Sequence, residues 1–317
     1  QWQHAMRTAI RCPRTLLQRL RLEDQVDLDR GSPFPLFVTE AFVARMEAGN
    51  LADPLLRQVL PLAVERLEAA GFSDDPLDEQ ADQPSAGLIQ KYQGRVLLVL
   101  NGTCGIHCRY CFRRAYPYTE TRLDEEAVLA TIAADADIQE VIYSGGDPLT
   151  LVDPTLSRLT RRLGEIPHVR TLRVHTRMPV VVPSRVNDAL LDWLQAFPGP
   201  TTLVLHSNHA QELDGEVARG VSRLRAAGVM VLNQAVLLAG VNDSLEALVQ
   251  LSWRLLELGV FPYYLHQCDR VRGAAHFEVP VARGLALVSQ LRTRLPGHAV
   301  PRYVVEEPGQ PAKTILA

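Results

Sequence analysis

Six short apolar segments, separated by predicted helices, dominate the chain from residue 95 onward. They are apolar on both faces, as expected for strands of a parallel sheet covered by helices. No Gly-x-Gly-x-x-Gly follows the first segment, so the order favours a partial barrel over a doubly wound nucleotide-binding sheet. The predicted strands are 95–100, 140–144, 171–176, 202–207, 229–235 and 261–266, and the predicted helices are 124–134, 154–163, 188–197, 211–227 and 245–258.

The region before these segments predicts helices and no chemistry. Apolar residues recur at helical spacing in 15–22, 37–46 and 54–70, with Pro61 as an internal break. Residues 74–85 are acidic and contain proline, which is typical of a surface connection. We therefore expect a helical extension over 1–86, a barrel core over 87–270 and a C-terminal segment over 271–317.

Polar residues follow or close each predicted strand. The carboxyl ends of parallel barrel strands share one rim, where ligands bind, so we expect these residues to meet. One such histidine would count as an ordinary buried residue, but their recurrence at equivalent ends favours a site. The polar groups are the cysteine loop after 95–100, Ser144 to Asp147, His175 to Arg177, His206 to His209, Asn233 with Gln234, and His266 to Asp269.

Three of the five cysteines, Cys104, Cys108 and Cys111, lie in a Cys-x3-Cys-x2-Cys spacing. Thiolates this close in sequence can bind one metal centre. An iron–sulfur cluster held by three cysteines leaves one iron open to an outside ligand, whereas a structural zinc needs four ligands. His107 could complete such a zinc site, although its position next to Cys108 suits a tetrahedron poorly, and reduced core thiols are the third alternative.

Composition excludes several classes of protein. The chain has 317 residues, 47% of them hydrophobic, and no apolar run of membrane-spanning length, so we expect no membrane partner. A formal charge of -3 gives no reason to expect nucleic acid as a partner. Clustered cysteines without a secretory leader predict a cytoplasmic protein, in which Cys12 and Cys268 are packed thiols.

Lysine is scarce. Among 33 basic residues only Lys91 and Lys313 are lysines. A lysine amine can form a Schiff base or lose its proton, and arginine practically cannot. Either lysine alone could be a residue of biased composition, but both are candidates for chemistry.

The cysteine segment resembles a known family. Cys104-x3-Cys108-x2-Cys111 resembles the signature of radical S-adenosylmethionine (SAM) proteins, and Cys108-Arg-Tyr-Cys-Phe-Arg-Arg114 resembles lysine 2,3-aminomutases. The resemblance implies a 4Fe–4S cluster held by the three cysteines. Ser144-Gly145-Gly146-Asp147 resembles the family's Gly-Gly-Asp-Pro element, which implies a contact with the amino group of SAM.

The same resemblance implies pyridoxal 5′-phosphate (PLP) as a cofactor. Lys313 corresponds to the catalytic lysine that forms a Schiff base with PLP, although Gly309-Gln-Pro-Ala312 departs from the glycine run of the family's preceding turn. Lys91, Tyr92 and Arg95 correspond to a segment whose cations neutralise the phosphate, with Lys91 where arginine is usual. His266 is expected to face the cofactor.

Substrate choice is implied at three positions. Arg113 corresponds to the residue that binds the carboxylate of the amino acid, and Asp269 and Glu306 to the pair that holds the distal ammonium of lysine, with glutamate replacing the usual aspartate at Glu306. Two buried carboxylates would leave charge unpaired against an acidic or neutral side chain. Free L-lysine is therefore the expected substrate, and β-lysine the product of 2,3-amino migration.

Further matches resemble the branch that makes β-lysine for modifying elongation factor P. This branch implies a pathway link to that factor and its lysyl ligase, an electron donor such as flavodoxin or ferredoxin, and a possible homo-oligomer. The alternatives are a catabolic lysine aminomutase, which usually has a longer C-terminal extension, and a non-enzymatic zinc-binding module. The matches lie in 34–37, 46–50, 53–59, 263–269 and 273–277.

Overall fold

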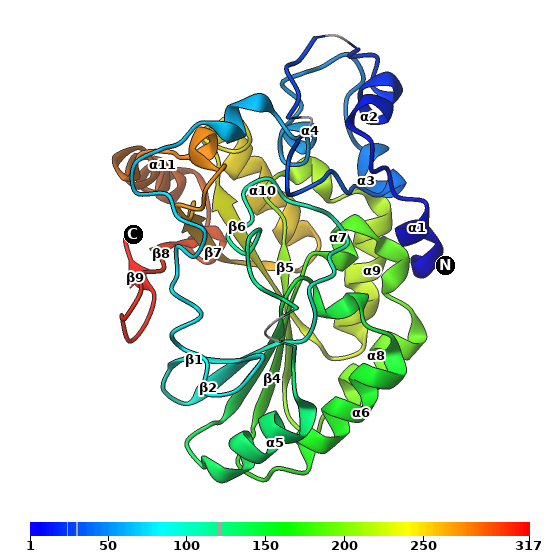
Figure 1. Ribbon diagram of the computed structural model, residues 1–317, viewed down its shortest axis with the longest axis vertical. Coiled ribbons are helices and arrows are strands. Elements are labelled where there is room, and N and C mark those ends of the chain that lie inside the picture. The colour runs from blue at the N-terminus through cyan, green and yellow to red at the C-terminus, as the bar shows by residue number, and fades with distance from the viewer. Residues whose placement is uncertain (24, 30, 120–121) are drawn as a thin grey trace.

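The computed structural model describes residues 1–317 except 24, 30 and 120–121. The described residues form one nine-stranded sheet in which each strand pairs with the next along the chain (Figure 1). The six predicted strands are confirmed, with ends shifted by at most two residues. The strands are β1 (Leu88–Tyr92), β2 (Arg95–Val99), β3 (Glu140–Ser144), β4 (Thr171–Thr176), β5 (Thr201–His206), β6 (Met230–Leu237), β7 (Phe261–Gln267), β8 (Arg302–Val305) and β9 (Thr314–Ile315).

The sheet is an open barrel. Strands β2 to β8 pair in parallel, while β1 and β9 pair antiparallel at the two edges. The strand order runs from β1 to β9, and within the described residues these two edges do not pair with each other. The middle of the sheet is buried on both faces, because Leu203, Val204 and Leu205 in β5 are all fully buried. The predicted partial barrel is confirmed, with β8 as a seventh parallel strand.

Helices between the strands cover the outer side of the sheet, where Figure 1 shows α6, α8 and α9 side by side. Side chains of Asp124, Asn187, Asp214 and Ser244 accept backbone N–H groups at the first turns of four of these helices, which fixes where each begins. The helices are α5 (Glu125–Ala134), α6 (Asp153–Gly164), α7 (Met178–Val181), α8 (Asp188–Gln195), α9 (Gly215–Ala226), α10 (Leu245–Glu257) and α11 (Val281–Arg294). Short 3-10 turns are η2 (Pro148–Thr150), η3 (Pro183–Arg185), η4 (Ala210–Glu212), η5 (Ala275–Phe277) and η6 (Gly297–Ala299).

The N-terminal region is less helical than predicted. Its helices are α1 (Trp2–Arg7), α2 (Pro13–Arg19), α3 (Glu40–Val43), α4 (Pro54–Arg57) and the 3-10 turn η1 (Ala63–Arg66). The predicted helix over 37–46 starts late because Val38 pairs with Ile10 in an extended bridge. The one over 54–70 ends at Arg57, because Pro61 disfavours helix in the residue before it and Leu62 pairs with Leu28.

The apolar side chains of this region nevertheless belong to the main core. Leu16, Phe42 and Leu55 lie in the same buried cluster as Leu203 and Leu205 of the sheet. The N-terminal region is therefore packed against the barrel and can contribute side chains to its rim. No helix among the described residues is long and apolar enough to cross a bilayer.

Candidate active site

Residues from neighbouring strand ends meet at one rim, as the sequence predicted. The rings of His175 in β4 and His206 in β5 lie 5.8 Å apart, and Nε2 of Gln234 in β6 lies 2.8 Å from Nε2 of His206. Burial, with Arg177 as a further cause, lowers the pKa of His206 to about 3, so this ring is neutral. The rim thus brings neutral ring nitrogens and amides to the carboxyl ends of the central strands.

The cysteine loop lies directly against the glycine turn after β3. Backbone N–H groups of Gly146 and Asp147 donate to the carbonyl oxygens of Asn101 (2.7 Å) and Thr103 (2.8 Å). A Cβ on Gly146 would lie 2.6 Å from the Thr103 oxygen, and one on Gly145, whose φ is +125°, would lie 2.5 Å from that of Asn101. Only glycine allows this approach.

Two of the three half-buried cysteines, Cys104 and Cys111, resist ionisation on their own. Burial raises the pKa of Cys104 well above its ordinary value, and neighbouring Cys111 adds to this effect. Burial and then Cys108 raise the pKa of Cys111 to about 12. Three thiolates so close together need a cationic centre to stabilise them. The loop is therefore chemically suited to a metal cluster.

The zinc alternative gains no support. Among the described residues, no three or more His, Cys, Asp and Glu side chains converge on a point suited to one metal ion. His107 stacks on Phe34 at 4.6 Å between ring centroids, and its Nδ1 lies 2.8 Å from the carbonyl oxygen of Pro35. A cubane cluster does not need convergence on one ion, because each cysteine binds a different iron.

Asp147 is engaged by the protein itself. Its carboxylate accepts hydrogen bonds from the Thr176 hydroxyl and the backbone N–H of Arg177, both at 2.7 Å, and also from the N–H groups of Leu149 and Met178. Burial raises its pKa to about 6, against these hydrogen bonds. The side chain thus fixes the end of β4 relative to the glycine turn. A contact between Asp147 and SAM stays a prediction.

Arg113 is buried in a fixed environment. Its Nε and Nη2 donate to the two carboxylate oxygens of Glu79 at 2.6 and 2.7 Å, and its Nη1 donates to the Ser144 hydroxyl at 2.9 Å and the Gly145 carbonyl at 3.3 Å. The guanidinium therefore lies beside the glycine turn, and its contact with a substrate carboxylate stays a prediction.

Glu79 was missed by the sequence analysis. It lies in the acidic stretch 74–85, expected to be a surface connection, yet only 4% of it is exposed. It also lies 4.0 Å from Nζ of Lys91. Nothing in its spacing separates it from the solvated acidic residues around it.

Lys313 lies beside Glu306 because the chain doubles back. Strand β9 pairs antiparallel with β8, with Val305 opposite Thr314, so the loop between them returns Lys313 to Glu306. The Lys313 ammonium forms an ion pair with Glu306, and Lys91 reaches the same carboxylate at 3.4 Å. The β8–β9 pairing thus places Lys313 next to Glu306, although the turn at 309–312 departs from the glycine run of the family.

Tyr92 and Arg95 join this group. The Arg95 guanidinium lies 4.8 Å from the centroid of the Tyr92 ring, and Nζ of Lys313 lies 6.0 Å from it. Burial and then Glu306 raise the pKa of Tyr92, so its hydroxyl stays protonated. The two lysines, Tyr92 and Arg95 are therefore close neighbours.

Several buried side-chain nitrogens around this group have no hydrogen-bond partner within the described structure. They include Nε of Arg95, Nε of Arg173, Nε2 of His175 and Nε2 of His266. Burial and then Lys313 lower the pKa of His266 to about 3, so its ring is neutral. Unsatisfied buried groups are costly unless a ligand or water meets them. They fit an anionic ligand such as a phosphate ester, and Arg173 is a member that the sequence analysis did not single out.

The two carboxyl groups of the expected ammonium site, Asp269 and Glu306, have different pKa values. Burial opposes ionisation of Glu306, but Lys313 and Lys91 outweigh it and lower its pKa to about 2. Burial and then Glu306 raise the pKa of Asp269 to about 7. Glu306 is thus ionised and paired with the two lysines, whereas Asp269 is about half protonated near pH 7.

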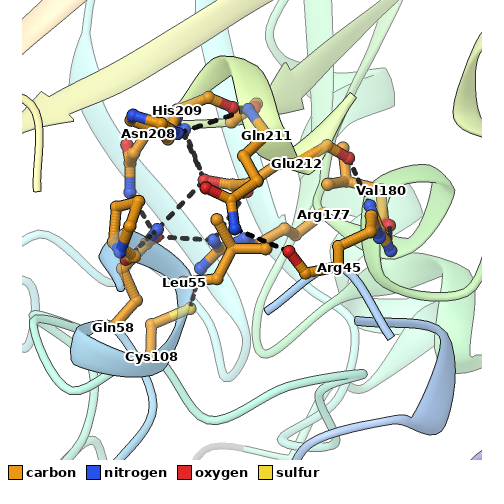
Figure 2. Close-up of polar contacts among 12 residues, drawn as sticks. Arg45, Leu55, Gln58, Cys108, Arg177, Val180, Asn208, His209, Gln211 and Glu212 are labelled. Carbon is orange, nitrogen blue, oxygen red and sulfur yellow. Dashed lines mark hydrogen bonds and ion pairs between the residues drawn. The ribbon is translucent and has the colours of Figure 1, made fainter. Parts of the chain in front are cut away.

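A second unpredicted group surrounds Arg177. Figure 2 shows its guanidinium between Cys108, Gln58 and Glu212, which come from the cysteine loop, the end of α4 and η4. These partners are far apart in sequence, and no motif connects them.

Comparison with known proteins gives consistent matches. The chain is 41% identical over 322 residues to the L-lysine 2,3-aminomutase of Escherichia coli, covering 99% of this chain and 94% of that protein. It is 39% identical to that of Haemophilus influenzae, covering 100% and 95%, and 36% identical to that of Clostridium subterminale, covering 87% and 67%. No family model matches the chain.

Solved structures resemble the fold. Streptococcus suis SuiB bound to S-adenosylmethionine aligns with a TM-score of 0.50 at 14% identity, covering 68% of this chain and 51% of that one. A radical SAM methyltransferase from Sphaerobacter thermophilus aligns with a TM-score of 0.50 at 21% identity, covering 68% of both chains. At such identities the likeness concerns the barrel architecture alone.

Proposed function

Because this chain belongs to the L-lysine 2,3-aminomutase family, we propose that it is an isomerase converting L-α-lysine to β-lysine by 2,3-amino migration. The observation that carries the proposal is that Lys313 and Lys91 both pair with the Glu306 carboxylate, beside the Tyr92 ring, which also contacts Arg95. Membership of an enzyme family sets aside the non-enzymatic zinc module.

Three cofactors are proposed, each at residues that fit it. Cys104, Cys108 and Cys111 would hold a 4Fe–4S cluster, and the backbone of Gly145 and Gly146 would approach SAM. Lys313 would bind PLP covalently, with Arg95, Lys91 and the neutral ring of His266 around it. When bound, the cluster and SAM would supply radical chemistry that abstracts a hydrogen atom, and PLP would delocalise the unpaired electron during nitrogen migration.

The protein orients the amino acid by its two ends. Arg113 would bind the α-carboxylate, since Glu79 and Ser144 hold its guanidinium in place. Asp269 and Glu306 would bind the distal ammonium. Glu306 already pairs with Lys313 and Lys91 in the structure, so Asp269 would supply the carboxylate that is not committed to a lysine of the chain.

An anaerobic assay tests the proposal. Purified protein with reconstituted iron and sulfide, SAM, PLP, a reductant and L-lysine should form β-lysine. A Lys313→Ala variant should form none, while Glu307→Gln, which changes an exposed acid that accepts a hydrogen bond from the Thr314 hydroxyl, should keep its activity. Full activity in Lys313→Ala, or wild-type protein without product, would overturn the assignment.

We further propose that the β-lysine serves modification of elongation factor P in the cytoplasm, with flavodoxin or ferredoxin as electron donor. The motifs at 34–37, 46–50 and 263–269 support this branch over a catabolic aminomutase. Deleting the gene should abolish β-lysylation of elongation factor P. Retention of that modification would favour the catabolic alternative.

A further inference from the structure

Arg177 connects the cysteine loop to two other parts of the molecule. Its side chain is buried at the end of β4, where Nη1 donates to Sγ of Cys108 and the hydroxyl of Tyr110, both at 2.7 Å. Its Nη2 donates to the side-chain oxygen of Gln58 at 2.7 Å and to Glu212 at 2.8 Å (Figure 2). A positive charge is thereby held against one cysteine sulfur.

Glu212 holds this guanidinium in place and neutralises its charge. Its side chain is fully buried, and its second oxygen accepts from the backbone N–H groups of Asn208 (2.9 Å) and His209 (3.1 Å) and from Nε2 of Gln58 (3.1 Å). The carboxylate is thus anchored by the loop after β5, independently of Arg177. Such a network leaves the guanidinium few alternative positions.

We infer that Arg177 and Glu212 are positioning residues that set the reduction potential of the cluster at Cys108, Arg177 raising it and Glu212 lowering it. The inference rests on the proposed function, because it needs Cys108 to be a cluster ligand. Hydrogen bonds to ligand sulfurs and nearby charge tune such potentials.

The direction follows from charge. The couple transfers one electron from the reductant to the oxidised cluster, which gains one negative charge, and no bond is made or broken. A cationic N–H donor stabilises the more negative reduced form more strongly. A buried carboxylate 2.8 Å from that cation reduces the effect.

The test is an anaerobic potentiometric titration with dithionite and redox mediators, followed by electron paramagnetic resonance of the reduced cluster. In Arg177→Gln, the reduced-to-oxidised ratio at a fixed potential should fall about tenfold, which is ~59 mV for one electron. Glu212→Gln should shift the midpoint upward. The double variant avoids an unpaired buried charge, and its midpoint should fall less than that of Arg177→Gln.

Arg185→Gln is the matched control, because Arg185 is also buried and paired, at 2.7 Å with Asp153, and its hydrogen bonds among the described residues go to Leu149, Leu151 and Asp153 rather than to a cysteine. Its midpoint should equal that of the wild type. Unchanged midpoints in the Arg177 and Glu212 variants with full iron and sulfide would overturn this inference alone. If Arg177→Gln assembles no cluster, the midpoints of Glu212→Gln and of the double variant test the inference in its place. Wild-type protein without iron and sulfide would instead overturn the proposed function.

Discussion

Lys91 and Lys313, the two lysines of the chain, form ion pairs with opposite oxygens of the same carboxylate, that of Glu306. They approach it from β1 and from the loop before β9, near the two edges of the open barrel. One acidic side chain therefore bridges the edges that the sheet leaves unpaired. The proposed function would place it beside both the cofactor and the substrate.

Replacing Glu306 tests this double position. In Glu306→Gln, both lysines lose their charged partner, and the proposed ammonium contact is lost. We expect a loss of about 2 kcal/mol in lysine binding, or roughly thirtyfold in KM, together with weaker PLP absorbance. Glu307→Gln is the control and should match the wild type. An unchanged KM would show that Glu306 does not contact the substrate.

The raised pKa of Asp269 predicts pH-dependent binding. Its carboxyl group, with a pKa of about 7, is protonated in more acidic solution, and a protonated acid cannot pair with an ammonium. Affinity for lysine should therefore rise with pH, by up to about tenfold per unit below pH 7, and level off above it. Calorimetry from pH 5.5 to 8 measures this.

The Asp269→Asn variant separates the effect of Asp269 from that of Asp147, whose pKa of about 6 lies in the same pH range. It should bind lysine more weakly, with a flatter pH profile. If its slope equals that of the wild type, another group titrates in this range.

Glu79 should matter for both stability and recognition. Glu79→Gln leaves the buried Arg113 guanidinium without its anion, and breaking a buried pair costs about 3 kcal/mol of unfolding free energy. We also expect KM for lysine to rise about tenfold with little change in kcat, because Arg113 loses its fixed orientation.

Chemical denaturation and steady-state kinetics measure the two effects. Glu68→Gln is the control, since Glu68 is exposed and lies 3.8 Å from an exposed Arg272. Equal stability of Glu79→Gln and wild type would mean that Arg113 finds another partner.

The glycine turn should be intolerant of a methyl group. In Gly146→Ala, the new Cβ would lie 2.6 Å from the Thr103 oxygen, so the cysteine loop must move. We expect most of the bound iron and sulfide to be lost while the barrel stays folded, as measured by metal analysis and circular dichroism. Gly297→Ala, which meets no atom within 4 Å, is the control and should keep its cluster.

The sequence predicted the barrel well because short strands buried on both faces are a local signal. It also predicted that polar residues at strand ends would gather, since parallel strands share a rim. The predicted N-terminal helices were too long, because pairing of Val38 with Ile10 and Leu62 with Leu28 overrides the local pattern. Such pairings depend on tertiary context.

The contacts around Arg177 and Arg113 could not be predicted locally. Gln58 and Glu212 meet Arg177 from 119 and 35 positions away, and Glu79 meets Arg113 across 34. A buried glutamate has the same sequence appearance as a solvated one. The roles of Lys313 and Glu306 came from family resemblance, and their contact with each other required the β8–β9 pairing.

The cysteine loop is held in place by residues that precede it in the sequence, and one of these residues also contacts a residue that follows it. Backbone N–H groups of His107 and Arg109 donate to the carbonyl oxygens of Phe37 (2.9 Å) and Gln58 (2.8 Å), while Gln58 also meets Glu212. During synthesis, Phe37 and Gln58 therefore leave the ribosome before the residues that they contact in the cysteine loop and η4. The cysteine loop can therefore complete these contacts only after η4 has been made, and we expect the apolar side chains of the N-terminal region to lack them until then.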